Sequence, residues 1–146
     1  MPVDARAVIR DLLATQLVDE AIRHLWKPYE WGGNGPDTFD CSGYILYLLR
    51  KVGLWGDDDA IAQDIFLRFR PYKVTKPYKG CLVFYGDKET NIAHVVLALN
   101  ERFIIGANGH DIKRVSIEPI DYRTKRYNYT DYLCQVDPTF SQKTLA

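Results

Sequence analysis

The sequence has no excess charge of either sign, no paired cysteines and no long apolar run. Nineteen basic residues balance nineteen acidic ones in a chain of 146, so no net field attracts nucleic acid or an anionic membrane surface. Three cysteines are too few and too scattered for a disulfide framework, and none forms the Cys-x-x-Cys pair of a zinc site. No apolar run approaches the roughly 20 residues of a membrane span. These absences predict no nucleic-acid partner, no membrane partner, no metal and no other cofactor.

The N-terminus also lacks a recognisable export signal. Residues 1–6 do not have the charged, apolar and small-residue regions of a secretory leader, so we expect synthesis in the cytoplasm without a signal peptide. With 47% hydrophobic residues, the chain has enough apolar content for its own core. We expect one domain, 1–146, with a helical part over 1–70 and a sheet part over 78–140.

The most informative segment is 29–43, a glycine-punctuated loop that delivers Cys41 to the start of an expected helix. Apolar residues after Cys41 recur at one-face helical spacing up to Gly53, and Asp40 is a natural N-cap. Unpaired N–H groups and the helix dipole at such a start lower the pKa of a thiol. The backbone N–H of Cys41 can also hold the oxyanion of an attacked carbonyl. Cys41 is therefore the candidate nucleophile.

The remaining cysteines and the loop aromatics have simpler interpretations. Cys81 and Cys134 lie in apolar, strand-like runs, where a cysteine is usually a small buried residue without reactivity. Trp31 is interpreted as a wedge that packs the loop against the core. Tyr29 also carries a hydroxyl that can donate to an oxyanion or to a bound substrate.

Helical spacing marks the N-terminal part of the chain. Over 4–27 it predicts one long helix or two short ones that stop at Pro28. Within this segment, His24 has charged neighbours and is interpreted as a solvated surface histidine. The aspartates 57–59 are interpreted as a loop and the start of a helix that covers 60–70. A metal site is the alternative for these aspartates, but consecutive residues do not share a helix face.

From residue 78 onward the pattern changes to short strands. Apolar runs bounded by turn-forming residues predict strands over 80–86, 93–99, 102–107, 114–117 and 132–136. Short links between the first three predict an antiparallel meander. The Tyr-rich basic segment 122–129 is interpreted as a solvated loop, with contact to an anionic polymer as the alternative.

His94 stands in the second of these strands, where a buried and hydrogen-bonded histidine is the ordinary explanation. A cysteine nucleophile, however, needs an imidazole to take its proton and later pass that proton to the leaving amine. His94 is therefore the candidate base. A third polar group should orient its ring, and Asn108 and His110 share the same strand face if the third strand extends that far. Gly109 between them can bend the strand, so both remain candidates.

Four motifs together resemble the NlpC family of papain-like cell-wall cysteine endopeptidases, within a stretch from Leu17 to Gly109. They are Tyr29-x-Trp31-Gly32-Gly33, Phe39-Asp40-Cys41-Ser42-Gly43, Gly80-Cys81-Leu82-Val83-Phe84 and Ala93-His94-Val95. The order of cysteine first and histidine later agrees with a papain-like arrangement. The resemblance implies an α+β fold in which the nucleophile helix packs on an antiparallel sheet of about five strands.

The resemblance also implies a reaction. Such enzymes hydrolyse amide bonds in peptidoglycan stem peptides, typically between D-γ-glutamate and the diamino acid, through a thioester on the cysteine. By carry-over, Cys41 is the nucleophile and His94 the general base and acid. Tyr29 is an oxyanion or substrate contact, and Asp40 and Ser42 contact the polar end of the substrate.

The sequence departs from the family pattern at two positions. Cys81 stands where the family often has an aspartate; we interpret this position as structural and expect no loss of activity. Gly106 stands about where the third catalytic residue commonly falls, and it has no side chain to orient anything. The orienting group is therefore expected at Asn108 or His110, or is a water molecule.

Two other functions remain as alternatives. The same pair can cleave the N-acetylmuramoyl-L-alanine amide or transfer an acyl group to an amine. A wall-binding or tail structural module without turnover is the alternative of another class, favoured by Gly106 and disfavoured by the intact Cys41 and His94.

The cellular setting is expected from the same resemblance. Family members usually carry a signal peptide or wall-binding modules, and this sequence shows neither. We therefore expect a phage-derived lytic or tail-associated protein that reaches peptidoglycan in a phage particle or at lysis, with phage tail proteins as partners. Cytoplasmic action on muropeptides is the alternative.

Overall fold

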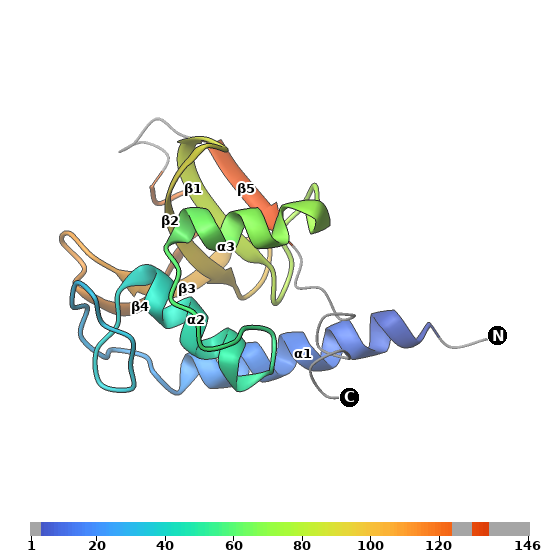
Figure 1. The fold of residues 1–146 in the computed structure, drawn as a ribbon, viewed down its shortest axis with the longest axis horizontal. Coiled ribbons are helices and arrows are strands. Elements are labelled where there is room, and N and C mark those ends of the chain that lie inside the picture. The colour runs from blue at the N-terminus through green and yellow to red at the C-terminus, as the bar shows by residue number, and fades with distance from the viewer. Residues whose placement is uncertain (1–3, 124–129, 135–146) are drawn as a thin grey trace.

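The described part of the chain folds as three α-helices set against one antiparallel sheet (Figure 1). The structure is a computed structural model that describes residues 4–123 and 130–134. Its helices are α1 (Ala5–Ile22), α2 (Cys41–Lys51) and α3 (Ala62–Phe69), followed by the short 3-10 helix η1 (Arg70–Tyr72). Its strands are β1 (Leu82–Lys88), β2 (Asn91–Ala98), β3 (Phe103–Asn108), β4 (Arg114–Pro119) and β5 (Thr130–Cys134).

The sheet has the order β4-β3-β2-β1-β5, with every neighbouring pair antiparallel. The first three strands form the expected meander and β4 extends it, because each link is short enough for neighbours in sequence to pair. The fifth strand pairs with β1 rather than with β4, so β4 and β5 lie at opposite edges of the sheet. The predicted α+β architecture, with a cysteine helix on a five-stranded antiparallel sheet, is confirmed.

Side chains of the strands alternate between the two faces of the sheet with period two. Both faces contribute buried apolar residues. One face packs against the helices in the main core, which includes Phe84, Val95, Leu97, Ile105 and Ala107 together with apolar residues of α1, α2 and α3. The opposite face forms a smaller cluster of buried residues, Cys81, Val83, Tyr85, Val96, Ala98 and Ile104. Cys81 is buried as predicted, while the side chain of Cys134 lies outside the described residues.

The acidic segment 57–59 differs from its predicted structure. Helix α3 begins only at Ala62, and it is the Asp64 side chain that accepts from the Ile61 N–H at its start. The preceding loop is instead held by Arg50, whose guanidinium donates to the carbonyls of Gly56 and Asp58. The segment is a loop as predicted, but the prediction that these aspartates begin a helix is wrong, because the Asp59 carboxylate accepts from the Ala60 N–H within the loop at 3.0 Å and α3 begins only at Ala62.

His24 is a buried residue, so its interpretation as a solvated histidine is wrong. Only 6% of its surface is exposed. Its Nε2 lies 3.1 Å from a carboxylate oxygen of Glu20, and its Nδ1 lies 2.9 Å from Lys27 Nζ. Its ring packs edge-on against Phe39 and Tyr47. The charged neighbours that suggested exposure are the partners that satisfy this histidine in the core.

Replacing His24 with alanine is expected to lower the free energy of unfolding by about 2 kcal/mol, because the change removes two buried hydrogen bonds and leaves a cavity beside two rings. Urea denaturation measures this loss. Arg23→Ala is the matched control, since the Arg23 side chain is 73% exposed and pairs with the same Glu20; an exposed pair contributes less than about 1 kcal/mol. Equal effects of the two substitutions would contradict a structural role for His24.

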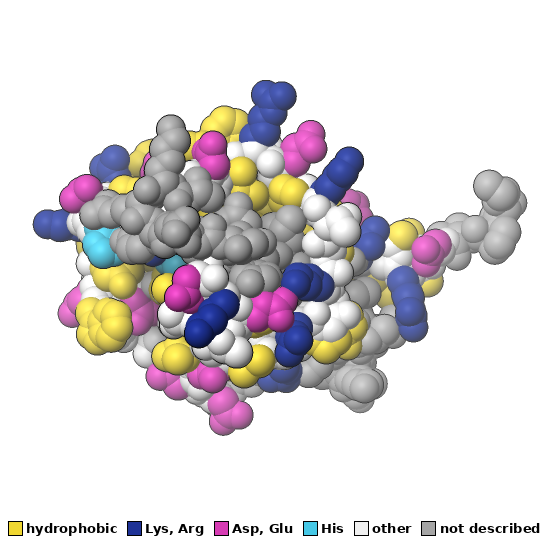
Figure 2. All heavy atoms as spheres, turned by 90° about the horizontal axis from the view of Figure 1, so that it is seen from above, with side chains coloured by type: hydrophobic (Ala, Val, Ile, Leu, Met, Phe, Trp, Pro, Cys, Tyr) yellow, Lys and Arg dark blue, Asp and Glu magenta, His cyan; other side chains and the backbone are white. Residues whose placement is uncertain are grey.

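The surface carries charges of both signs. Figure 2 shows acidic and basic side chains interspersed on the face seen from above, as the balanced composition leads one to expect. Within residues 4–123 and 130–134, no helix is long and apolar enough to cross a membrane.

Candidate active site

Cys41 is the first residue of α2, and Asp40 is its N-cap as predicted. One carboxylate oxygen of Asp40 accepts from the Gly43 N–H at 2.6 Å. The other accepts from the Gly32 N–H at 3.0 Å. Asp40 therefore joins the start of the helix to the glycine loop, and it fixes where the loop presents Cys41.

The two glycine motifs around Cys41 form one packing unit. The Asp40 N–H donates to the Gly33 carbonyl at 2.9 Å, and a Cβ added to Gly43 would lie 2.0 Å from that same oxygen. A side chain at Gly43 would therefore push the loop away from the first turn of α2. This contact explains why glycines appear both before the cysteine and after it.

The sulfur of Cys41 lies beside β2. The backbone N–H groups of Val95 and Ser42 hydrogen-bond the sulfur, and Val95 directly follows His94 in the chain. Cys41 lines a cleft of about 250 Å³ whose other lining residues include Tyr29, Trp31, Asp40, Ser42, Ile61 and Ile92. The half-buried sulfur thus sits between the helix start, the strand that carries the histidine and an open cleft.

His94 is held in the sheet with only 3% of its surface exposed. Its Nε2 lies 3.1 Å from Asn108 Oδ1 and 2.8 Å from the Tyr122 hydroxyl. The pairing of β2 with β3 explains the first contact. Leu97 lies opposite Ile105, and continuing this register along the strands places His94 opposite Asn108.

Asn108 determines which nitrogen of His94 carries the proton. The amide nitrogen of Asn108 donates to the Gly106 carbonyl at 3.1 Å and to Ser116 Oγ at 2.9 Å. A carbonyl can only accept, so the amide oxygen of Asn108 must face His94. That oxygen in turn requires a proton on Nε2. The lone pair of the neutral ring is then on Nδ1, which leaves Nδ1 free to act as a base.

Burial shifts the pKa values of both Cys41 and His94 towards their uncharged forms. Burial raises the pKa of the Cys41 thiol above its usual value, the Asp40 carboxylate adds to this rise, and the N–H groups of Val95 and Ser42 oppose it. Burial also holds the pKa of His94 well below its usual value, and the charge of Arg123 acts in the same direction. The predicted lowering of the Cys41 pKa is therefore wrong, because desolvation outweighs the helix N-terminus.

The two candidates for the orienting residue take different positions. Asn108 is the last residue of β3 and is 1% exposed. His110 lies beyond it in a turn, with a φ of 54°, so the period-two argument that placed both on one face ends at Gly109. Of the two, Asn108 makes the hydrogen bond to the His94 ring that orients it.

The space where a side chain of Gly106 would lie is occupied by the Val96 side chain. A Cβ at Gly106 would lie 2.5 Å from Cγ1 of Val96 on the adjacent strand. A larger residue at this position would need a different side chain at Val96. The Gly106 carbonyl instead orients Asn108, so this position acts through its backbone.

Two of the three aromatic residues of the loop, Tyr29 and Trp31, line the cleft. Trp31 is 88% exposed, so its interpretation as a core wedge is wrong; the buried aromatic residue of this loop is Phe39, which is fully enclosed. Tyr29 is half-buried, and burial together with the nearby Cys41 raises the pKa of its hydroxyl. Tyr29 therefore stays protonated and is a hydrogen-bond donor in the cleft.

Tyr122 is a site residue that the sequence analysis missed. The segment 122–129 was interpreted as a solvated loop, whereas Tyr122 is half-buried and bonds both His94 and Asn108; residues 124–129 lie outside the described part. No local pattern in the sequence marks this residue. Its contact with His94 of β2 forms because Tyr122 packs on the sheet beside Tyr85 of β1.

Comparison with known sequences decides the family. The profile of the NlpC/P60 family matches residues 26–134, which include Cys41, His94 and Asn108. The chain belongs to the NlpC/P60 family. The resemblance seen in the sequence motifs is confirmed by this match.

Curated relatives carry a similar NlpC/P60 segment in longer chains. The probable endopeptidase p60 of Listeria monocytogenes is 38% identical over 97 residues, which cover 66% of this chain and 19% of the relative. Protein P54 of Enterococcus faecium is 41% identical over 109 residues, covering 70% of this chain and 20% of that protein. The chain therefore spans about a fifth of the length of these relatives.

Solved NlpC/P60 structures share the fold. The P60 domain of antigen MAP1204 from M. avium subspecies paratuberculosis superposes with a TM-score of 0.70 at 21% identity, covering 88% of this chain and 97% of that one. The peptidoglycan hydrolase RipB of Mycobacterium tuberculosis gives a TM-score of 0.70 at 24% identity, covering 94% of this chain and 69% of that one. At this identity the likeness shows the fold.

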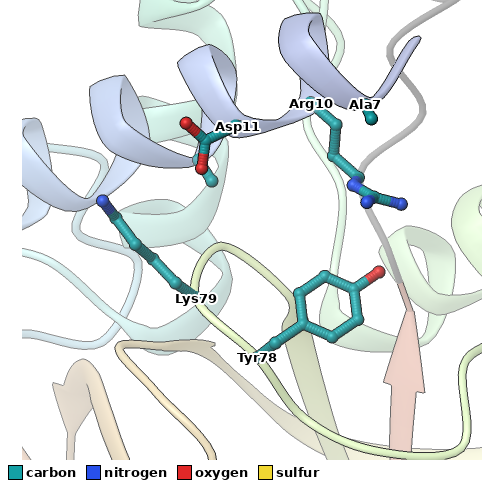
Figure 3. A pocket seen from close by; sticks show the side chains of 6 residues that line it. Ala7, Arg10, Asp11, Tyr78 and Lys79 are labelled. Atoms are coloured by element: carbon teal, nitrogen blue, oxygen red, sulfur yellow. The ribbon is translucent and has the colours of Figure 1, made fainter. Parts of the chain in front are cut away.

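A second concavity in this NlpC/P60 chain lies between α1 and the segment before β1 (Figure 3). Lys79 spans it and donates to Thr15 Oγ1 at 3.0 Å, while the Arg10 guanidinium stacks over the Tyr78 ring. Burial and the nearby Cys81 raise the pKa of Tyr78 to about 12. The described residues that line this concavity include neither a cysteine nor a histidine.

Proposed function

We propose that the chain is a cysteine peptidase that hydrolyses amide bonds in peptidoglycan stem peptides, at the bond between D-γ-glutamate and the diamino acid. The observation that carries this proposal is Cys41 at the start of α2 beside β2, whose His94 has its free nitrogen assigned by Asn108. Relatives named as probable endopeptidases support the peptidase activity. We also propose that the whole chain is one catalytic domain.

The reaction follows from the protonation states of the pair. His94 Nδ1 takes the thiol proton as the Cys41 sulfur attacks the carbonyl carbon. The resulting oxyanion is held by the Cys41 N–H, which has no partner within the helix at this position, and by the Tyr29 hydroxyl. Collapse breaks the C–N bond, and the amine leaves with the proton from Nδ1, so a thioester remains on Cys41.

Hydrolysis of the thioester restores the enzyme. Water gives a proton to His94 Nδ1 as its oxygen attacks the thioester carbonyl, and the C–S bond then breaks. The sulfur recovers the proton from the imidazole, and the acid product leaves. Asp40 and Ser42 line the cleft next to the sulfur. We propose that they contact the polar end of the stem peptide.

A defined substrate tests the bond assignment. The tripeptide L-alanyl-γ-D-glutamyl-diamino acid is expected to give L-alanyl-D-glutamate and the free diamino acid, identified by mass spectrometry. The matched control is the same tripeptide with an α-linked glutamate, which should remain intact. Release of L-alanyl peptides from a muramoyl substrate, with the γ-linked tripeptide untouched, would replace this assignment by the amidase alternative. Amide products formed with an added amine would indicate acyl transfer.

The resting protonation states predict a broad pH profile. In this mechanism the active protonation state has a neutral Cys41 thiol and a neutral His94 imidazole. It is populated at pH values between the lowered pKa of His94 and the raised pKa of Cys41. Activity should therefore stay level between about pH 6.5 and pH 8.5, the ordinary values of the two groups, and fall only outside that window. Measuring kcat/KM against pH checks this. An alkaline decline near pH 7 would instead indicate a thiolate–imidazolium pair.

For the setting, we propose a phage-derived lytic or tail-associated protein whose substrate is peptidoglycan and whose partners are tail proteins. The sequence has balanced charge, so the protein has no net field that would direct it to an anionic surface. Delivery in a particle is compatible with this balance. Immunoblotting of purified phage particles tests this proposal. Detection of the protein only in the cytoplasm of uninfected cells would favour muropeptide recycling.

A further inference from the structure

Tyr122 is placed firmly enough to act on the catalytic pair. It lies three residues beyond β4, where its backbone N–H donates to the Pro119 carbonyl at 3.0 Å. Its ring packs against the smaller core cluster on the sheet face opposite the helices. The ring meets Tyr85 edge-on, with centroids 5.8 Å apart and an angle of 86° between planes. Both the backbone and the ring of Tyr122 are thus fixed.

The hydroxyl of Tyr122 closes a three-membered hydrogen-bond network. It donates to Asn108 Oδ1 at 2.5 Å, and its oxygen lies 2.8 Å from His94 Nε2. The third side of this triangle is the 3.1 Å contact between Nε2 and Oδ1. Each member of the network therefore touches the other two.

The direction of each hydrogen bond follows from Asn108. Its amide nitrogen is engaged by the Gly106 carbonyl and Ser116, so its oxygen faces the other two groups and can only accept. The Tyr122 proton therefore points to that oxygen, and the Tyr122 oxygen offers its lone pairs to the Nε2–H of His94. The Nε2 proton is then shared between two acceptors.

We propose that Tyr122 is a positioning residue of the catalytic site, whose hydroxyl supplies the second acceptor for His94 Nε2–H and fixes the acceptor face of Asn108. This proposal deepens the proposed peptidase function and rests on it for its kinetic part. When Nδ1 takes the thiol proton, positive charge spreads over the ring, and a hydrogen bond from a charged donor is roughly twice as strong as a neutral one. The Tyr122 oxygen therefore stabilises the protonated ring more than the neutral ring.

A purely structural role for Tyr122 is the rival explanation, because its ring also fills the cluster beside Tyr85. Tyr122→Phe keeps this packing and removes only the hydroxyl. Tyr85→Phe is the matched control, since the buried Tyr85 hydroxyl donates to the Ile120 carbonyl at 2.8 Å in the same cluster. Both substitutions delete one phenolic hydroxyl from the same region, but only Tyr122 contacts the imidazole nitrogen through that hydroxyl.

The first readout is independent of activity. In ¹⁵N-labelled protein at neutral pH, the Nε2 proton of His94 is assigned by its loss in His94→Gln. We expect Tyr122→Phe to move this resonance upfield and to speed its exchange with solvent at least about tenfold, which corresponds to one lost hydrogen bond of about 1.4 kcal/mol. Tyr85→Phe should leave both unchanged. An unaltered Nε2 proton in Tyr122→Phe, or the same change in both variants, overturns the proposal.

The second readout separates positioning from substrate binding. On the γ-linked tripeptide we expect Tyr122→Phe to lower kcat about fivefold to tenfold with KM within twofold of wild type, since an interaction made to the protonated ring acts on the transition state. A raised KM at unchanged kcat would show a substrate contact and overturn the positioning role. If wild type itself does not cleave the tripeptide, the proposed function fails, while the resonance experiment still tests the network.

Discussion

His94→Ala is expected to lower kcat/KM on peptidoglycan by about 10³-fold or more, the range in which positioned general bases act. The reason is specific to this site. Because burial raises the pKa of the Cys41 thiol, attack is favoured by a group that takes the thiol proton during the reaction. A cysteine already present as thiolate would lose less, since it needs no base for the attack itself.

The control for His94→Ala is the reactivity of the thiol. Alkylation of Cys41 by iodoacetamide at neutral pH should slow in the variant, whereas at a pH above the thiol pKa the two proteins should react at similar rates. Circular dichroism and urea denaturation show whether the variant is folded. A folded His94→Ala protein that keeps more than a tenth of wild-type activity would contradict the role of His94 as base.

Asn108→Ala is expected to lower kcat about 10²-fold with little change in KM. Without the amide oxygen, the Tyr122 hydroxyl loses the acceptor to which it donates and can donate to Nε2 instead. The ring can then carry its proton on Nδ1, the nitrogen that has to accept from Cys41. The loss is smaller than for His94→Ala because a misplaced proton leaves part of the population competent. Steady-state kinetics on the γ-linked tripeptide measures both parameters.

His110→Ala is the matched comparison for Asn108→Ala. His110 lies in the turn after β3 with a φ of 54°, and we expect its replacement to change kcat by less than about threefold, since its influence on the pKa of His94 is smaller than those of burial, Arg123 and Asn108. A larger loss in His110→Ala than in Asn108→Ala would reverse the assignment of the orienting residue. Equal and negligible losses would remove both residues from it.

The position of Cys41 at a helix start and the fold were accessible from the sequence because they depend on local patterns. Asp40 before a helical apolar repeat indicates an N-cap, and glycines on both sides of Cys41 indicate close backbone approach. The strands followed from short apolar runs separated by turn residues. Features within a dozen residues of one another in the chain were therefore largely predicted.

The features that failed depend on the three-dimensional environment. The lowered thiol pKa was argued from the helix N-terminus alone, whereas the burial of Cys41 against β2 decides its direction. His24 has charged neighbours in sequence, but its ring packs between Phe39 and Tyr47 from other segments. Tyr122 reaches His94 across the sheet face. Such contacts between distant segments are not encoded in local periodicity.

The choice between Asn108 and His110 shows an intermediate case. Period-two alternation placed them on one face and could not separate them. Strand register separates them, because Leu97 opposite Ile105 implies His94 opposite Asn108. The sequence can give this register once the central residue of the turn between β2 and β3 is identified, because that residue fixes which strand residues lie opposite each other. No knowledge of side-chain packing is needed.

The central claim is that Cys41 hydrolyses an amide bond of the peptidoglycan stem peptide with His94 as its base. The most direct measurement is digestion of purified peptidoglycan by the wild-type protein and by Cys41→Ala, with soluble products identified by mass spectrometry. Fragments ending in γ-linked D-glutamate should appear with wild type and be absent with Cys41→Ala. Release of those fragments by the folded Cys41→Ala protein, or by neither protein on walls of more than one chemistry, would contradict the claim.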